Sequence, residues 1–228
     1  MLVPHGCVVD PDWHKSPEAE RYLGAALRRN QRGPWGLLER PVLSPQEAAD
    51  VVSYKVFVSG RSAVGKTALV ASLGGLQVPS AHHETTGIQT TSVYWPAKLR
   101  ESGRPLFFKF TFWDCGGSVV KKFDHILPAC IEKVDGFLLL FSFTDRASFD
   151  DLPSQISRVA EGAKNAVRIV IGTKYPLTLG AGGKSCSTHA HRHYALTFLD
   201  EGGTSDMLRV TLALSALIPV EVEALLTS

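Results

Sequence analysis

A strand, a glycine-rich loop and a helix follow one another in the stretch "YKVFVSGRSAVGKTALVASL", residues 54–73. The run "YKVFVS" is typical of a buried strand, and "KTALVASL" consists mostly of helix formers. Between them, "GRSAVGKT" fits the pattern G-x-x-x-x-G-K-[ST]. Such a loop presents consecutive backbone N–H groups at a helix N-terminus, where they bind phosphate oxygens. We therefore expect a phosphate-binding loop at residues 60–67 of an α/β domain.

The composition is that of an ordinary globular protein and argues against several functional classes. The chain has 228 residues, enough for one domain with an extension. A formal net charge of +2 gives no basic excess for nucleic acid. We find no apolar run of membrane-spanning length and no leader or lipidation signal, so membrane contact is expected to be indirect or weak. The 4 cysteines are scattered, which favours a reducing compartment.

Three regions differ in their sequence pattern. Residues 1–52 form an N-terminal extension, in which "SPEAERYLGAALRRNQR" predicts a helix capped by Ser16 and begun by Pro17, followed by a linker. Residues 53–175 alternate strands and helices, which predicts an α/β fold with a mostly parallel sheet flanked by helices. Residues 176–228 form a divergent C-terminal segment with little periodicity, in which a strand at "MLRVTLALSA" would complete the sheet edge.

The central region contains the remaining predicted elements. "TTSVYWPAKL" and "LFFKFTFWD", separated by "RESGRP", predict two strands joined by a hairpin turn. "GFLLLFSF" and "AVRIVIGT" are continuous apolar runs, typical of strands buried on both faces. A helix is expected between these two strands, at "DDLPSQISRVAEGA".

Two motifs assign chemistry to this fold. Within the glycine-rich loop, Lys66 is expected to reach the β- and γ-phosphates of a nucleotide, while the Thr67 hydroxyl binds Mg²⁺. In "FWDCGG", Asp114 ends a predicted strand and Gly117 follows three residues later. A D-x-x-G at that place lets Asp114 hold Mg²⁺ through water while the Gly117 N–H meets the γ-phosphate. A nucleotide and Mg²⁺ are therefore expected to share one site.

The order of these motifs resembles that of the Ras-superfamily small GTPases, particularly the Rab branch. "ETTGIQTT" is similar to their switch I, which implies that Thr85 contacts Mg²⁺ and the γ-phosphate. "GTK" at residues 172–174 is similar to the start of their guanine-recognition motif, and "FSFTDRASFDDL" to the stretch after their fourth strand. The resemblance implies a P-loop small-GTPase (Ras-like) fold that binds GTP or GDP with Mg²⁺, with Thr67, Thr85 and Asp114 as metal ligands.

The motifs and the resemblance together imply a set of nucleotide contacts, in which Lys66 and Thr85 would stabilise the transferred phosphate. His82 stands where many small GTPases place an aromatic residue over the nucleotide, although a solvated loop histidine is the alternative. The expected nucleotide-binding residues are Arg61, Ser62, Ala63, Val64, Gly65, Lys66, Thr67, Ala68, His82, Thr85, Gly117, Thr173 and Lys174.

A closer resemblance is to the Rem- and Rab-like small GTPases of the ciliogenesis and planar polarity effector complex. It rests on "HHETTGIQTT", "WPAKL", "FWDCGG" and "KKFDH", and it covers residues 8 to 175. The resemblance implies Fuzzy, Inturned and a WD-repeat effector as protein partners, and no nucleic acid. It also implies a role in cilium biogenesis, planar cell polarity, exocytosis and vesicle-linked protein transport, in the cytoplasm and at the basal body and cytoskeleton.

Two positions depart from the family pattern. Ser118 stands where most small GTPases carry the glutamine that orients the attacking water, so we expect hydrolysis below about 10⁻³ s⁻¹. Pro176 stands where the family's aspartate accepts hydrogen bonds from guanine, and unpaired base N–H groups would cost about 1–3 kcal/mol. Cys115 is expected to be a small packing residue. These departures leave two functions open: a GTP-switched regulator, or a nucleotide-loaded or nucleotide-free (pseudo-GTPase) scaffold subunit of a stable ciliogenesis complex that hardly turns over.

Overall fold

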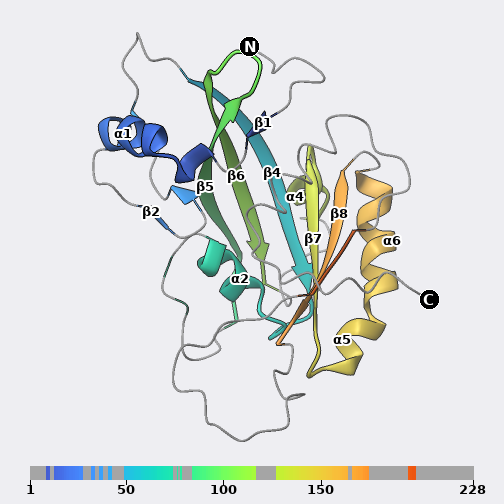
Figure 1. Cartoon of the computed structure of the whole chain (residues 1–228). Coiled ribbons are helices and arrows are strands. Elements are labelled where there is room, and N and C mark those ends of the chain that lie inside the picture. The colour runs from blue at the N-terminus through green and yellow to red at the C-terminus, as the bar shows by residue number, and fades with distance from the viewer. Residues whose placement is uncertain are drawn as a thin grey trace, which may run out of the picture.

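The fold is seen in a computed structural model of the whole chain (Figure 1). It describes residues 9–10, 13–27, 32–33, 36–37, 41–42, 49–73, 76, 78, 84–116, 127–163, 166–174 and 195–198. For residues 9, 32–33, 36–37, 159–162 and 195–198 the description is of the backbone alone.

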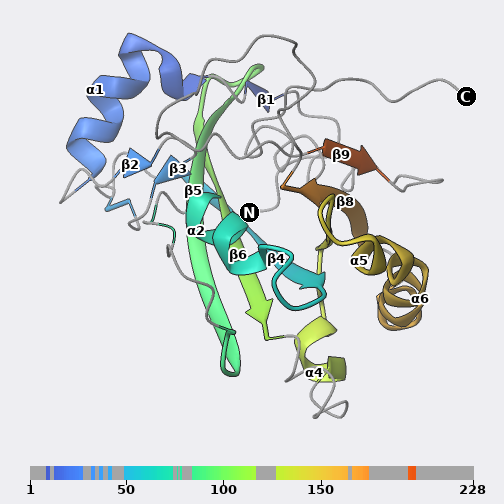
Figure 2. The same ribbon diagram turned by 90° about the horizontal axis from the view of Figure 1, so that it is seen from below.

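One sheet runs through the molecule, with the strand order β2-β3-β5-β6-β4-β7-β8-β9 (Figures 1 and 2). Its parallel centre consists of β4 (Asp50–Gly60), β6 (Pro105–Cys115), β7 (Gly136–Ser142) and β8 (Val167–Thr173). β5 (Ile88–Leu99) forms the predicted hairpin with β6, and the two strands are antiparallel. The mostly parallel α/β sheet and each of these strands are therefore confirmed.

Helices pack against both faces of this sheet (Figure 2). Side chains along β4 alternate between the two faces. Val56 and Val58 pack in one cluster with Leu69 of α2 (Lys66–Leu73). Phe57 packs in another cluster, against α4 (Leu127–Ile131) and α6 (Leu152–Gly162), which follows the short helix α5 (Arg146–Asp150). The helices predicted after the glycine-rich loop and between β7 and β8 are thus confirmed.

The helix of the N-terminal extension begins as predicted but ends early. In α1 (Pro17–Ala26) the Ser16 hydroxyl accepts a hydrogen bond from the Ala19 N–H at 3.1 Å, as an N-cap does. The prediction carried this helix on to Arg32, but Leu27 is already extended and Arg32 lies in β2 (Arg32–Gly33). Leu27 is buried against the sheet, so tertiary packing ends the helix where propensity alone would continue it.

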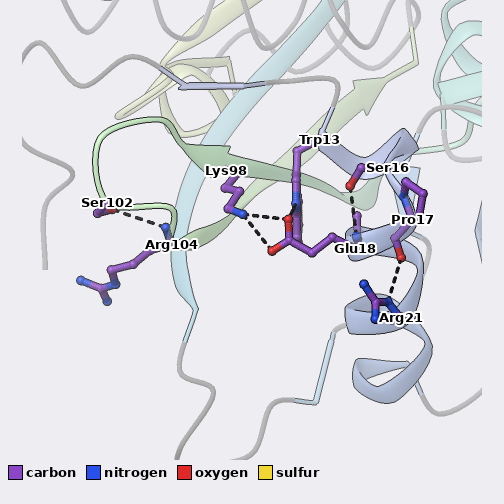
Figure 3. A network of polar contacts seen from close by, with 9 residues as sticks. Trp13, Ser16, Pro17, Glu18, Arg21, Lys98, Ser102 and Arg104 are labelled. Carbon is purple, nitrogen blue, oxygen red and sulfur yellow. Dashed lines mark hydrogen bonds and ion pairs between the residues drawn. The ribbon is translucent and has the colours of Figure 1, made fainter.

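The extension packs on the β5–β6 hairpin as part of the same core. Trp13 of the 3₁₀ helix η1 (Trp13–Lys15) and Leu23 of α1 are buried in one cluster with Tyr94 and Phe107. Figure 3 shows Lys98 of β5 reaching across to the extension, where its Nζ donates to both Glu18 carboxylate oxygens at 2.8 Å. This ion pair lowers the pKa of Glu18.

Short strands of the extension also join the sheet. β1 (Val9–Asp10) pairs antiparallel with the end of β5, and β3 (Gly36–Leu37) pairs with both β2 and β5. The prediction of a linker after the helix is therefore wrong at β3, where backbone pairing with Tyr94 makes the segment part of the sheet.

At the opposite edge, β9 (Ala195–Phe198) pairs antiparallel with β8. The sequence predicted no strand there, because the residues around it carry little periodicity. The strand expected at "MLRVTLALSA" lies outside the described residues. Within the part of the chain that the structure describes, no helix has the length and apolarity needed to cross a membrane.

Candidate nucleotide site

The glycine-rich loop connects the carboxyl end of β4 to the first residue of α2. Gly60 and Gly65 have φ angles of 150° and 101°, which glycine adopts readily. A Cβ atom on Gly60 would lie 2.6 Å from the Leu140 carbonyl oxygen of β7, so this position also needs glycine for space. Ala63 takes a φ of 64° without being glycine. The loop therefore has the backbone of a phosphate nest, opening on a helix N-terminus.

The side chain of Lys66 lies inside this loop. It is 7% exposed, and its Nζ donates to the carbonyl oxygens of Gly60 and Arg61 at 2.9 Å each. Burial lowers the pKa of Lys66, while the nearby Asp114 carboxylate acts in the opposite direction. A buried cation whose Nζ donates to two neutral carbonyl oxygens is well placed to take an anionic phosphate as its partner.

Thr67, Thr85 and Asp114 come together although they lie far apart in the sequence. The Thr67 hydroxyl donates to Asp114 Oδ2 at 2.5 Å, and the Thr67 and Thr85 hydroxyl oxygens are 2.8 Å apart. The Thr85 hydroxyl also lies 3.5 Å from Asp114 Oδ2, so both hydroxyl groups face the same carboxylate oxygen. Three oxygen-bearing side chains from the loop helix, the segment before β5 and the end of β6 thus meet at one point.

The Asp114 carboxylate is buried, and one of its two oxygens has no hydrogen-bond partner among the described residues. Asp114 is 2% exposed, and the oxygen in question is Oδ1. A buried carboxylate oxygen left without a partner is costly unless a cation or a bound water satisfies it. Hydroxyl and carboxylate oxygens are the donors that Mg²⁺ takes, usually with several waters of its own. The residues present therefore fit a Mg²⁺ ion.

Thr173 and Lys174 support the loop from the end of β8. The Thr173 hydroxyl lies 2.6 Å from the Val64 carbonyl oxygen and 3.0 Å from that of Phe141. Lys174 Nζ donates to the Ala63 carbonyl oxygen at 2.8 Å. The structure thus brings both predicted residues to the glycine-rich loop, where they hold its backbone in place.

The remaining predicted residues divide into three groups. Val64 is buried under the loop, Ala68 is half-buried in α2, and Ser62 is exposed. The Arg61 side chain turns to Asp151, between α5 and α6, where its Nη1 lies 3.2 Å from Asp151 Oδ2, while its backbone carbonyl oxygen accepts from Lys66 Nζ. His82, Gly117, Ser118 and Pro176 lie outside the described residues.

Two contacts near the site could not be read from the motifs. The Ser59 hydroxyl lies 3.1 Å from Gln155 Oε1, which with Arg61 and Asp151 fastens the loop to α6. Cys115 is buried, as expected of a packing residue, and it shares a buried cluster with Cys130. Burial is the main cause that raises the pKa of the Cys115 thiol to about 12. No local spacing in the sequence signals either contact.

Comparison with known proteins assigns the chain to a family. The model of the Ras family matches residues 55–201. The mouse protein "Ciliogenesis and planar polarity effector 2" is 63% identical over 171 residues, covering 75% of this chain and 66% of that protein. Its zebrafish counterpart is 48% identical over 204 residues, covering 89% of this chain and 81% of that protein.

A more distant relative, the human "GTP-binding protein REM 2", is 31% identical over 146 residues, which are 63% of this chain and 40% of that protein. The chain spans slightly less than two thirds of the length of the mouse relative. The family match covers the phosphate loop, the Thr67–Thr85–Asp114 cluster and the Thr173–Lys174 support. The chain belongs to the Ras family and has the P-loop small-GTPase fold.

Proposed function

We propose that this chain is a GTP-binding regulator that holds its nucleotide with Mg²⁺ and hydrolyses it slowly. The observation that carries the proposal is the buried Asp114 carboxylate, whose Oδ1 has no partner among the described residues while its Oδ2 contacts Thr67. A cation bound there would lie beside Lys66, and the two positive charges would attract one polyphosphate.

Each residue of the site has a defined part in this proposal. Lys66 would donate to the phosphates, and Thr67 and Thr85 would supply hydroxyl oxygens to the ion. Asp114 would hold the ion directly or through water. When bound, Mg²⁺ neutralises charge on the β- and γ-phosphates. Ser118 is too short to orient a water as glutamine does, which is why slow hydrolysis is part of the proposal.

Few residues of the site are available to select guanine over adenine. Thr173 and Lys174 are engaged with carbonyl groups of the loop and of β7. The next positions are Tyr175 and Pro176, and proline has no side-chain acceptor for the base. We propose that GTP and GDP bind chiefly through their phosphates and Mg²⁺, with weaker discrimination against adenine than an aspartate would give.

The cellular role is inferred from the relatives. Proteins named for ciliogenesis and planar polarity match most of this chain. We propose that it acts in cilium biogenesis and vesicle-linked protein transport, in the cytoplasm and at the basal body. Fuzzy, Inturned and a WD-repeat effector are the proposed partners. They would bind the loops around Thr85 and Asp114 when GTP is bound.

A scaffold that stays loaded with nucleotide is the second candidate. Ser118 and Pro176 favour it, since one weakens hydrolysis and the other weakens base recognition. Such a subunit would bind its partners equally well with GTP and with GDP. The first candidate requires a preference for GTP.

Fluorescent GTP and GDP titrated onto the purified full chain test nucleotide binding directly, with unlabelled ATP as the competitor. Lys66→Gln removes the buried charge and is expected to weaken binding by about 10–100-fold, the value of a charged hydrogen bond. Lys133→Gln is the matched control, because the Lys133 side chain is 89% exposed. Equal affinity of Lys66→Gln and the unchanged protein would overturn the proposed site.

A further inference from the structure

Two cysteines that the nucleotide site does not use are in contact beside it. Cys115 is the last residue of β6, directly after Asp114, and Cys130 lies in α4. Both are free thiols and 3% exposed, and they pack in the same cluster as Phe57. They are neighbours there, since burial and then the nearby Cys130 raise the pKa of the Cys115 thiol. Between them run residues 116–129, which include Gly117 of the D-x-x-G motif and Ser118 directly after it.

Contacts that do not involve sulfur hold Cys130 in this place. Lys55 of β4 donates from Nζ to the Glu132 carbonyl oxygen at 2.9 Å, and to that of Ala129 at 3.5 Å. Its backbone N–H donates to Asp135 Oδ2 at 2.7 Å. These bonds attach the chain to β4 on both sides of Cys130. The two cysteines therefore lie together because the sheet and α4 place both in one buried cluster.

We propose that Cys115 and Cys130 form a modification site, at which a two-electron oxidant of the peroxide class joins them in a reversible intramolecular disulfide. Two S–H bonds break and one S–S bond forms. The two protons and two electrons reduce one hydrogen peroxide molecule to two water molecules. A dithiol such as dithiothreitol reverses the step and becomes a cyclic disulfide itself.

The consequence of this bond follows from its position in the chain. It ties the residue after Asp114 to α4, so that residues 116–129 become a closed loop whose two ends cannot separate. A cross-link of this kind stabilises the fold by restricting the unfolded chain. Because both thiols are buried, an oxidant reaches them only when the structure opens locally, so the reaction is expected to be slower than that of an exposed cysteine.

The test uses the full chain with Cys7→Ser and Cys186→Ser, which leaves only the proposed pair. After hydrogen peroxide, the intact mass is expected to fall by two hydrogen atoms, and proteolysis is expected to release one peptide pair joined through Cys115 and Cys130. Dithiothreitol restores the mass. The melting temperature of the oxidised form is expected to rise by about 5–10 °C.

Cys130→Ala in the same background is the matched control, with its own reduced form as the reference. It should show neither the loss of two hydrogens nor the rise in melting temperature. Peptide mapping of the unmutated protein identifies the joined cysteines even if a variant folds poorly. Added oxygen atoms without a cross-link, disulfides only between molecules, or a cross-link that forms only in urea would each overturn the proposal. None of these readouts depends on nucleotide binding.

Discussion

Ala63 adopts a left-handed backbone conformation in the phosphate loop, with a φ of 64°. A Cβ atom makes this conformation unfavourable by about 1–2 kcal/mol, which glycine avoids. Ala63→Gly is therefore expected to raise the free energy of unfolding by about 0.5–1 kcal/mol, after the greater freedom of glycine in the unfolded chain is subtracted.

The same exchange in α2 supplies a control of opposite sign. Ala68→Gly lies in a helix and is expected to lower the free energy of unfolding by about 1 kcal/mol. Urea unfolding of the nucleotide-free chain measures both. If Ala63→Gly destabilised the protein as much as Ala68→Gly, the loop would not hold Ala63 in a strained conformation.

At the scale of residues, the motifs predicted which side chains lie together but not the contacts between distant segments. They predicted that Lys66, Thr67 and Asp114 lie near one another, as they do, because their spacing is tied to a strand, a loop and a helix. They could not predict the unpartnered Asp114 Oδ1 or the Cys115–Cys130 contact. Both depend on how segments far apart in the sequence pack, which no local pattern records.

At the scale of elements, the central strands and helices were predictable because apolar runs and turn residues mark them. The extension was predictable only in part, since its helix begins at Pro17 after the Ser16 cap as expected. Its helix ends at Ala26, where Leu27 is buried against the β5–β6 hairpin, and β3 joins the sheet by backbone pairing with Tyr94. Local propensity yields to tertiary packing at these two places.

The docking of α1 can be tested through one side chain. Leu23 is 2% exposed and packs with Tyr94 and Phe107. Leu23→Ala is expected to lower the free energy of unfolding by about 2–5 kcal/mol, as a cavity in a shared core does. Arg21→Ala, at an exposed position on the same helix, should change it by less than about 0.5 kcal/mol. Urea unfolding with no difference between the two variants would mean that the extension is not part of the cooperative core.

At the scale of the whole molecule, the extension and the nucleotide site share one sheet. The extension packs on the β5–β6 hairpin at Tyr94 and Phe107. At the open end of the hairpin, where Ile88 pairs with Cys115, Thr85 and Asp114 lie in the nucleotide site. The boundaries at residues 52 and 175 remain predictions, while the Ras-family match runs on to residue 201.

Partner binding distinguishes the regulator from the scaffold. If the chain is a GTP-switched regulator, Thr67→Asn should abolish binding to the proposed ciliogenesis partners, because it removes a hydroxyl that contacts both Thr85 and Asp114. Pull-down with GTP- and GDP-loaded protein measures this, and the melting temperature checks that the variant folds. Undiminished binding by a folded Thr67→Asn protein would support the scaffold and contradict the switch.

The central claim is that Thr67, Thr85 and Asp114 hold a Mg²⁺ ion that fixes the nucleotide. The most direct measurement is the release rate of fluorescent GDP from the purified full chain, with Mg²⁺ and after its removal by a chelator. We predict tight binding with Mg²⁺, much faster release once the ion is removed, and the fast rate at all Mg²⁺ concentrations for Asp114→Asn. A GDP release rate that does not change with Mg²⁺, or no binding of GDP at all, would contradict this account of the site.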